Sequence, residues 1–488
     1  MRFIYFTSIL IVQAACALRF RLGRDKGGNL GAPHVENVEL PKAQWFKQKL
    51  DHFSPADQTT WKQRYFVNDT FYDFSNPGPV FLMIGGEGPA DPKWMVQGAW
   101  IDYATKFNAL CINLEHRYYG ESHPTEDMSV KNLQYLSSSQ ALADLAYFIH
   151  AMNNKYKLAK GVKWIAFGGS YPGSLAAWLR LKYPHLVHAA VSSSGPLLAK
   201  VDFVEYFEVV IDALREKTGK EDCAYEVKQG HAEIIKLMET NPTLIQHEFK
   251  VCQPFDRATA NDLNNFYDTL ANNFAGVVQY NEDNRIGSNP KYRNVTINTI
   301  CNMLTEQTAR PSHMKLADFN SVILAVENQT CLDYSYDNMI QELRNISWSN
   351  EGARQWMYQT CTEFGFYQTS TGTTPFFGDK FPVDFYIQQC QDIFGKKFNK
   401  KFVNDAAAWT NNYYGSLDIN VSRVVFVHGS VDPWHALGVT TPRDNAPAIY
   451  IHGTAHCANM YPPSEKDLPE LKAARVKIEQ LLSEWIAS

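Results

Sequence analysis

The stretch Lys163-Trp-Ile-Ala-Phe-Gly-Gly-Ser170-Tyr-Pro-Gly-Ser-Leu-Ala-Ala-Trp178 decides the fold class of this chain. Its apolar run, 164–167, is typical of a parallel strand buried on both faces, and a helical pattern resumes at Leu175 after two glycines. Such a strand-to-helix turn strains the serine backbone and needs minimal side chains beside it, but leaves the hydroxyl open to a substrate and a base. The stretch therefore predicts acyl transfer through a covalent ester of Ser170.

The turn departs from the usual G-x-S-x-G pattern, because Pro172 replaces the second glycine and Gly173 follows it. Proline suits the first turn of a helix, and it leaves the N–H of Tyr171 available as one donor of an oxyanion hole. The alternative is a glycine-rich corner with an incidental serine, since short motifs also match by chance.

Length and composition are those of a large globular protein. At 488 residues the chain exceeds one typical core, so we expect two domains or one domain with a large insertion. The chain is 45% hydrophobic and 20% charged. Its net charge of −5 does not indicate the basic surface that binds nucleic acid or an anionic membrane. We therefore expect no nucleic-acid partner.

The N-terminus predicts a secretory signal peptide at residues 1–17. Arg2 precedes an apolar stretch at 3–15, and Ala15-Cys-Ala17 supplies the small residues of a cleavage site. A buried N-terminal strand is the weaker alternative. No later segment has 18 consecutive apolar residues, so we expect no membrane span and a secreted or lysosomal protein.

Sequons and cysteines agree with that route. Five N-x-Ser/Thr sequons are candidate glycosylation sites: Asn68, Asn294, Asn328, Asn345 and Asn420. Of nine cysteines, eight remain once Cys16 is removed with the signal, and none forms a C-x-x-C pair. Structural disulfides are therefore favoured over zinc or redox sites, but the spacing does not choose among the pairings.

The alternation of strand and helix patterns predicts an α/β fold with a doubly wound parallel sheet. Short apolar runs read as strands at 79–84, 109–115, 163–167, 189–193, 423–427 and 448–451. A helix with Ser137-Ser-Ser139 as a cap lies between two of them, and a closing helix spans about 464–485.

The pattern changes between about 200 and 400. Apolar residues recur there at helical spacing from Phe203 to Leu214, further helices are expected near 232–238 and 261–279, and most of the cysteines fall inside. We interpret residues 200–400 as a helical, disulfide-stapled insertion that divides the sheet domain into 18–199 and 401–488.

A serine nucleophile needs a base and an orienting carboxylate, which in this fold follow in the order Ser, acid, His. Asp432 follows the strand at 423–427, and His456 follows the strand at 448–451. His435 lies too close to Asp432 to serve as its base, and His428 and His452 stand at strand ends, where a structural role is more common. Taken alone, Asp432 also fits a turn residue before proline.

The loop Gly85-Gly-Glu-Gly-Pro89 follows the strand at 79–84, and Gly86 is the candidate for the second oxyanion donor. A phosphate-binding loop is disfavoured, because no Lys-Ser/Thr follows and no G-x-G-x-x-G opens a helix. The chain also lacks an H-E-x-x-H motif, so we expect neither cofactor nor metal.

Two glutamates near strand ends are hypothetical substrate-binding residues. A buried carboxylate of Glu87 or Glu115 would favour a cationic partner, such as the α-amine of a peptide. For Glu115 an internal ion pair with Arg117, two residues on, is at least as good an interpretation.

Several motifs resemble the family of lysosomal Pro-X carboxypeptidase and dipeptidyl peptidase 2. The likeness runs from about Trp45 to the C-terminus, and the thymus-specific serine protease branch is the most similar. The motifs that carry it are Gly85-Gly-Glu-Gly-Pro89, Glu115-His-Arg-Tyr-Tyr-Gly-Glu-Ser122, the 168–178 stretch, Cys361-Thr-Glu-Phe-Gly-Phe-Tyr-Gln-Thr369, Gly429-Ser-Val-Asp-Pro-Trp434 and Ala455-His-Cys457.

The resemblance implies a serine exopeptidase of α/β-hydrolase fold, acting on peptides, with a helical domain over the site. By motif match Ser170 is the nucleophile, Asp432 the orienting acid and His456 the base. Characterised members prefer a proline beside the scissile bond, and this preference transfers only weakly. The chain departs from its relatives at Pro172 and at His428, where asparagine is more usual.

The resemblance also implies the cysteine pairs Cys223–Cys301, Cys252–Cys331 and Cys361–Cys390. It leaves Cys111 and Cys457 unassigned. Cys457 adjoins the expected base, so its state would bear on activity.

Two other functions remain open. The same triad serves esterases and lipases, because it does not choose between ester and amide. A hydrolase fold that has lost catalysis and acts as a binding protein is the third interpretation. The sequence leaves open a homodimer and the choice between carboxypeptidase and dipeptidyl aminopeptidase.

Overall fold

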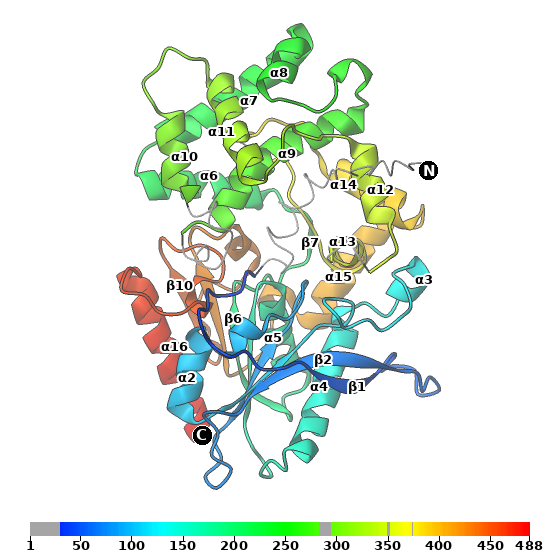
Figure 1. Cartoon of the computed structure of the whole chain (residues 1–488), viewed down its shortest axis with the longest axis vertical. Helices are drawn as coiled ribbons and strands as arrows, with labels where there is room; N and C mark the ends of the chain where they lie inside the picture. Colours follow the sequence, from blue (N-terminus) through cyan, green and yellow to red (C-terminus); the bar gives the residue numbers. More distant parts are fainter. Residues whose placement is uncertain (1–29, 283–293, 349–351, 373) are drawn as a thin grey trace, which may run out of the picture.

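A computed structural model describes residues 30–282, 294–348, 352–372 and 374–488. The predicted signal peptide at 1–17 lies outside these residues. Figure 1 shows a sheet with its flanking helices in the lower half of the molecule and a group of helices over it.

The main sheet has eight strands in the order β1-β2-β4-β3-β5-β6-β9-β10. Strands β1 and β2 pair antiparallel, as do β2 and β4, whereas all other neighbours are parallel. This order with one antiparallel end is the α/β-hydrolase arrangement. The strands are β1 Gln44–Lys49, β2 Thr60–Asn68, β3 Val80–Ile84, β4 Leu110–Leu114, β5 Trp164–Gly169, β6 Val187–Ser193, β9 Val424–Gly429 and β10 Ala448–Ile451.

All six predicted strands are present and the predicted α/β fold is confirmed, while β1 and β2, which the sequence analysis did not predict, add an antiparallel end to the sheet. Strands β1 and β2 alternate buried and exposed side chains, with lysines among the exposed ones. An alternating pattern of this kind is typical of an antiparallel edge with one solvated face, and it lacks the continuous apolar run of the central strands.

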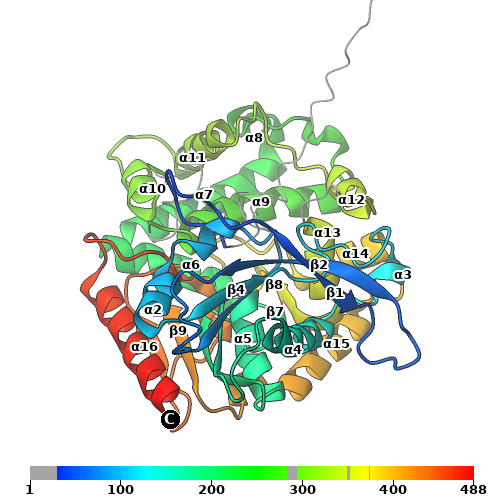
Figure 2. The same ribbon diagram turned by 60° about the horizontal axis from the view of Figure 1, so that its bottom comes forward.

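Helices cover both faces of the sheet (Figure 2). Alternate side chains of β3 enter two different cores: Leu82 joins the core under α4 (Ser138–Lys155) and α5 (Tyr171–Lys182), and Met83 joins the core under α2 (Ala99–Phe107) and α16 (Pro469–Ala487). Helix α4 begins where the sequence predicts, since the Ser137 hydroxyl accepts the Gln140 N–H. The central strands are thereby buried on both sides.

The chain between β6 and β9 is mainly helical, as expected, and lies over the sheet in Figure 1. Because β6 and β9 are neighbours in the sheet, this region leaves and returns at adjacent strands. It also holds a small parallel pair that the sequence did not reveal, β7 (Lys200–Asp202) and β8 (Gly365–Tyr367). The limits of a separate domain at 200–400 stay a prediction. Its helices are α6 Glu205–Thr218, α7 Asp222–Thr240, α8 Pro242–Glu248, α9 Ala260–Gln279, α10 Ile297–Leu304, α11 Ser312–Val326, α12 Tyr336–Arg344, α13 Ala353–Gln359, α14 Val383–Phe394 and α15 Lys400–Tyr414.

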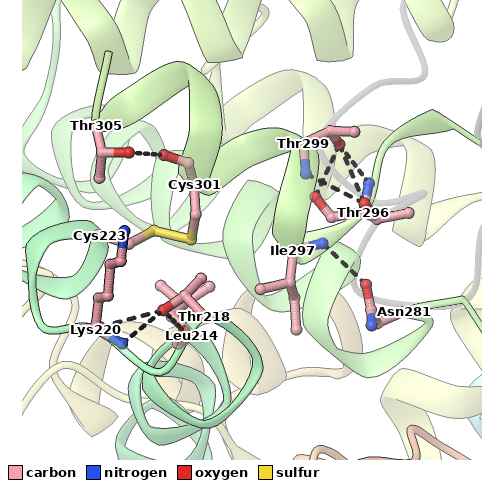
Figure 3. Close-up of a disulfide and its surroundings, with 10 residues drawn as sticks. All are labelled: Leu214, Thr218, Lys220, Cys223, Asn281, Thr296, Ile297, Thr299, Cys301 and Thr305. Carbon is pink, nitrogen blue, oxygen red and sulfur yellow. Dashed lines mark hydrogen bonds between the residues drawn. A yellow bond between two sulfur atoms is a disulfide. The ribbon is translucent and has the colours of Figure 1, made fainter. Parts of the chain in front are cut away.

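The three disulfides implied by the family resemblance are present, all in this helical region: Cys223–Cys301, Cys252–Cys331 and Cys361–Cys390. Figure 3 shows the first, which joins the start of α7 to α10. The other two described cysteines, Cys111 and Cys457, are buried and form no disulfide.

Four of the five sequon asparagines are exposed, Asn294, Asn328, Asn345 and Asn420. Asn68 is half-buried, and its Nδ2 donates to the carbonyl of Met95 at 2.8 Å, which disfavours a glycan there. Across the described ranges, no helix combines the length and the hydrophobicity needed to cross a membrane.

Candidate active site

Ser170 stands at the turn from β5 into α5, in the strained conformation expected of a nucleophile. Its φ and ψ are 64° and −135°, in a region that non-glycine residues rarely adopt. A Cβ on Gly168 would lie 2.0 Å from the carbonyl oxygen of Pro172, and one on Gly169 would lie 2.3 Å from Sδ of Met460. The backbone contact therefore requires glycine at 168, whereas a side chain at 169 would have to displace that of Met460.

Asp432 and His456 meet as the sequence predicts. Asp432 follows β9 and caps a short helix at Pro433–Leu437, where its Oδ1 accepts the N–H of Trp434 at 3.1 Å. The same Oδ1 lies 2.9 Å from Nδ1 of His456, which follows β10. Both side chains are fully buried, so water does not compete for this bond.

Burial and pairing act in opposite directions on these two groups. Burial alone would raise the pKa of Asp432, but the adjacent His456 outweighs it, so the pKa of the carboxyl falls below its usual value. Burial alone would lower the pKa of His456, and the Asp432 carboxylate raises it well above 6.5. The geometry thus gives an ionised Asp432 beside an imidazole that readily accepts a proton.

Backbone contacts bring the segment of His456 against the Ser170 turn. The N–H of Ser170 donates to the carbonyl of Ser193 at 2.9 Å, and the N–H of Cys457 donates to Oγ of Ser194 at 2.9 Å. A Cβ built on Gly169 would lie 3.0 Å from Sγ of Cys457. The residues next to the expected nucleophile and base are therefore in direct contact at one edge of the sheet.

The loop after β3 lies on the same turn. A Cβ on Gly86 would lie 2.4 Å from Cγ of Pro172, so the loop packs directly on the start of α5. Within the described residues, neither the N–H of Gly86 nor that of Tyr171 has a hydrogen-bond acceptor. One unused amide from each of these two packed segments is the arrangement expected of an oxyanion hole.

A small cavity of about 50 Å³ opens between this loop and the turn. Its lining includes Glu87, Trp94, Asn113, Gly169 and Pro172. Glu87 is 6% exposed, so the cavity holds a largely buried carboxylate close to the serine turn.

Glu115, the second hypothetical substrate ligand, is instead part of the protein's own framework. Its carboxylate pairs with Arg64 and also accepts the N–H of Ala90 at 2.9 Å, the N–H of Glu121 at 3.1 Å and the Ser122 hydroxyl at 2.6 Å. These donors use both oxygens, which favours an internal role for the Glu115 carboxylate over substrate binding.

The expected internal partner of Glu115 is also wrong. Arg117 instead pairs with Asp144 of α4. Its Nε donates to Oδ2 at 2.6 Å, and its Nη2 donates to Oδ1 at 2.7 Å. Arg64, which pairs with Glu115, comes from β2, a strand that the sequence did not predict.

The competing histidines take structural positions. Nδ1–H of His435 donates to the carbonyl of Asp432 at 2.8 Å, and His452 is exposed. The ring of His428 is buried against Gly438, and burial lowers the pKa of His428 to about 4. Of these histidines, His456 is the one bonded to the Asp432 carboxylate.

Gln279, the last residue of α9, is a contact of the site that the sequence analysis did not predict. Its carbonyl accepts the N–H of His456 at 3.1 Å, and its Oε1 accepts Nε1–H of Trp434 at 2.9 Å. It thereby braces both the base and the loop of Asp432 from the helical region. A glutamine in an amphipathic helix carries no local signal for this contact, which depends on tertiary structure alone.

Comparison with known proteins places these motifs in a family. A family model described as serine carboxypeptidase S28 matches residues 48–478. A Caenorhabditis elegans protein whose name assigns it to the serine proteases is 38% identical over 482 residues, 95% of this chain and 93% of its own length. Thymus-specific serine protease of Mus musculus is 36% identical over 459 residues, 92% of this chain and 88% of its own. Lysosomal Pro-X carboxypeptidase of Mus musculus is 29% identical over 503 residues, 98% and 96% of the two chains. The predicted resemblance is confirmed over most of the chain.

Proposed function

The chain belongs to the serine carboxypeptidase S28 family of serine-type peptidases, and from that premise we propose that it is an exopeptidase that cleaves peptides through an acyl-enzyme on Ser170. The observation that carries the proposal is the buried bond between Asp432 and His456, at the sheet edge where the strained Ser170 stands.

In the first step Oγ of Ser170 attacks the scissile carbonyl carbon, and Nε2 of His456 takes the hydroxyl proton. Asp432 holds Nδ1–H of the imidazole and stabilises the imidazolium that forms. The imidazolium then gives its proton to the leaving amine as the C–N bond breaks, which leaves the peptide acyl group as an ester on Ser170.

The second step reverses these roles. His456 takes a proton from water, the resulting hydroxide attacks the ester, and the proton returns to Ser170 as the C–O bond breaks. In both steps negative charge develops on the carbonyl oxygen, and the N–H groups of Tyr171 and Gly86 would stabilise it. One such donor is typically worth about 10²–10³ in kcat.

Substrate recognition is assigned to the cavity beside the turn. The buried carboxylate of Glu87 would bind the α-ammonium of a peptide, because a desolvated carboxylate favours a cationic partner. Preference for proline beside the scissile bond is drawn from the Pro-X name of one relative. Glu87→Gln should raise KM for peptides with a free amino terminus but not for their N-acetylated forms. Equal kinetics for both would remove Glu87 from recognition.

The place of action is an oxidising compartment. Three disulfides persist in secreted and lysosomal proteins but are rare in the cytosol, and the four exposed sequons fit the same route. A secreted or lysosomal enzyme is the corresponding proposal.

The decisive test is labelling with a fluorophosphonate, which reacts with an activated serine. Ser170→Ala should abolish labelling and peptidase activity while secretion is unchanged. Ser174→Ala is the matched control, because its hydroxyl, on the same helix, is buried and bonds the Pro196 carbonyl at 2.7 Å. Labelling that survives in Ser170→Ala would assign the nucleophile to another residue.

The esterase alternative is separated by substrate choice. A peptidase of this kind should hydrolyse prolyl dipeptide amides at rates that a simple esterase does not reach, and both substrates should lose turnover together in Ser170→Ala. Turnover of nitrophenyl esters alone would favour the esterase.

A further inference from the structure

A buried chain of hydrogen bonds joins the helical region to the Ser170 turn through the side chain of Tyr171. The Tyr171 hydroxyl lies 3.1 Å from Nε2 of His116 and accepts from Nε2 of Gln359 at 3.1 Å. Nδ1 of His116 lies 2.7 Å from the carbonyl of Arg117, so Nδ1 carries the proton. Burial lowers the pKa of His116 to about 4, so the ring is neutral and its Nε2 accepts the Tyr171 proton.

The orientation of Gln359 is fixed in the same way. Its Oε1 accepts from the Tyr119 hydroxyl at 2.7 Å, so its amide nitrogen must face the other two partners, Tyr171 and Glu363. Oε2 of Glu363 accepts from that nitrogen at 3.1 Å. Each donor in this hydrogen-bond network therefore has a defined acceptor, and the bonds run outward from the Gln359 amide in two directions, to Glu363 and through Tyr171 to His116.

The chain of hydrogen bonds ends at the buried carboxylate of Glu363, which has no cationic partner among the described residues. Glu363 is 4% exposed, and no Lys, Arg or His of the described residues forms an ion pair with it. It accepts instead from the N–H of Ser138 at 2.9 Å and from the Ser138 hydroxyl at 2.6 Å. Ser138 is the first residue of α4, where the positive end of the helix dipole stabilises an anion. The helical region is thereby tied to a helix of the sheet.

The backbone around Glu363 departs from regular helical geometry, and such departures cost conformational free energy. α13 ends at Gln359 and continues as a π-helical turn at Thr360–Phe364, which is followed by Phe366 with φ of 62°. π-helical turns and non-glycine residues at positive φ are uncommon and occur frequently at functional sites. This irregular turn carries the one carboxylate of the chain of bonds.

We propose that Gln359 and Glu363 are positioning residues that hold Tyr171, and with it the N–H that the proposed function assigns to the oxyanion hole. Tyr171 follows the strained Ser170 directly, and its ring is clamped by the hydroxyl bonds at one end and by Trp356 and Phe364, with ring centroids 5.7 and 5.4 Å away, along its side. A loosened ring lets the first peptide of α5 relax, and oxyanion stabilisation falls steeply when a donor moves by a fraction of an ångström.

A role in positioning and a role in stability alone predict different kinetics. If the bonds only stabilise the fold, Tyr171→Phe lowers the melting temperature and leaves kcat per active site unchanged. If they position the donor, Tyr171→Phe and Gln359→Leu each lower kcat by about 10-fold with KM within about twofold, because the lost interaction exists only in the transition state. Active sites are counted by fluorophosphonate titration, so misfolded protein does not enter kcat.

The second readout is the affinity for a peptidyl boronic acid, which mimics the tetrahedral intermediate. It is compared with the affinity for a product peptide, which binds without being cleaved. Both variants should weaken boronate binding by about the same 10-fold as kcat and leave product binding unchanged. The double variant should lose little more than either single variant, because both act through one hydroxyl. Tyr334→Phe is the matched control: it removes a hydroxyl that bonds two carbonyls elsewhere in the helical region.

The outcomes separate this inference from the proposed function on which it rests. Unchanged kcat and boronate affinity in Tyr171→Phe, in an enzyme whose labelling still requires Ser170, overturn the positioning role alone. Labelling that does not require Ser170 overturns the proposed function itself.

Discussion

The sheet and the helical region are stabilised by different means. Every residue of β3, β4, β5 and β9 is buried, and both unpaired cysteines, Cys111 and Cys457, lie in the sheet half. The helical region has all three disulfides. Strands buried on both faces form a continuous apolar core, whereas amphipathic helices with one apolar stripe gain more from covalent ties.

The two regions also contribute differently to the site. The sheet half presents the groups proposed to react, at the ends of β5, β9 and β10, whereas the helical region presents two glutamines, Gln279 and Gln359, that contact their segments. The helical region therefore does more than cover the sheet, since it hydrogen-bonds to the segments of both the proposed nucleophile and the proposed base. The following predictions test this division.

The largest effect is expected in the sheet half, from Asp432→Asn. The imidazole loses the carboxylate that orients it, and kcat should fall by about 10⁴ with little change in melting temperature. The pKa of His456, now raised well above 6.5 by Asp432, should also fall. Catalysis needs a neutral His456, so kcat/KM should rise with pH through an inflection above 6.5 that moves lower in the variant. An inflection at the same pH in both proteins contradicts this.

The helical region should respond most to loss of a disulfide. Replacing both Cys252 and Cys331 with alanine opens a loop with a sequence separation of 79 and should cost about 4 kcal/mol of unfolding free energy. Hydrogen exchange should rise in α7 to α12 and stay low in β3, β5 and β9. A uniform rise would show that the two halves unfold as one unit.

Acid should weaken both halves through buried neutral histidines. Burial lowers the pKa of His231, in the helical region, to about 4. Below about pH 6.5 this imidazole therefore binds a proton in the unfolded chain but stays neutral in the folded chain. Stability should therefore fall as pH drops from about 6.5 to 4, by about 3 kcal/mol for this group. His231→Leu should flatten that fall in urea titrations. His428, shifted in the same direction, gives the matched variant in the sheet half.

The smallest effect concerns the loop after β3. Gly86→Ala places a methyl group 2.4 Å from the Pro172 ring, so the loop must shift and carry its N–H with it. We expect kcat to fall about 10-fold or more with the helical region undisturbed, since one oxyanion donor moves. Wild-type kcat in this variant would exclude Gly86 from the oxyanion hole.

The sequence predicts the parts of this protein whose signals are local. Continuous apolar runs identify the six strands from β3 to β6, β9 and β10, and the glycines around Ser170 identify the turn, because both patterns follow from burial and steric demand at the position itself. Since this fold places the nucleophile, the acid and the histidine in that order along the chain, the turn at Ser170 leads to Asp432 and His456 as the candidates for the other two roles.

What the sequence does not predict depends on contacts between distant segments. The alternating β1 and β2 resemble exposed loops, and without β2 the partner of Glu115, Arg64, could not be foreseen. Gln279 and Gln359 are ordinary glutamines in helices until the fold brings them to the base and to Tyr171. Such roles are set by tertiary structure and leave no local pattern.

The position of the acid and the base after the last two strands has a consequence for biosynthesis. Ribosomes complete Ser170 well before Asp432 and His456, so a nascent chain carries a hydroxyl without the imidazole that would activate it. With the proposed triad, peptidase activity arises only when the final strands, β9 and β10, have joined the sheet beside β6. The incomplete chain is thereby inactive during translation, and no inhibitory segment is needed until synthesis is complete.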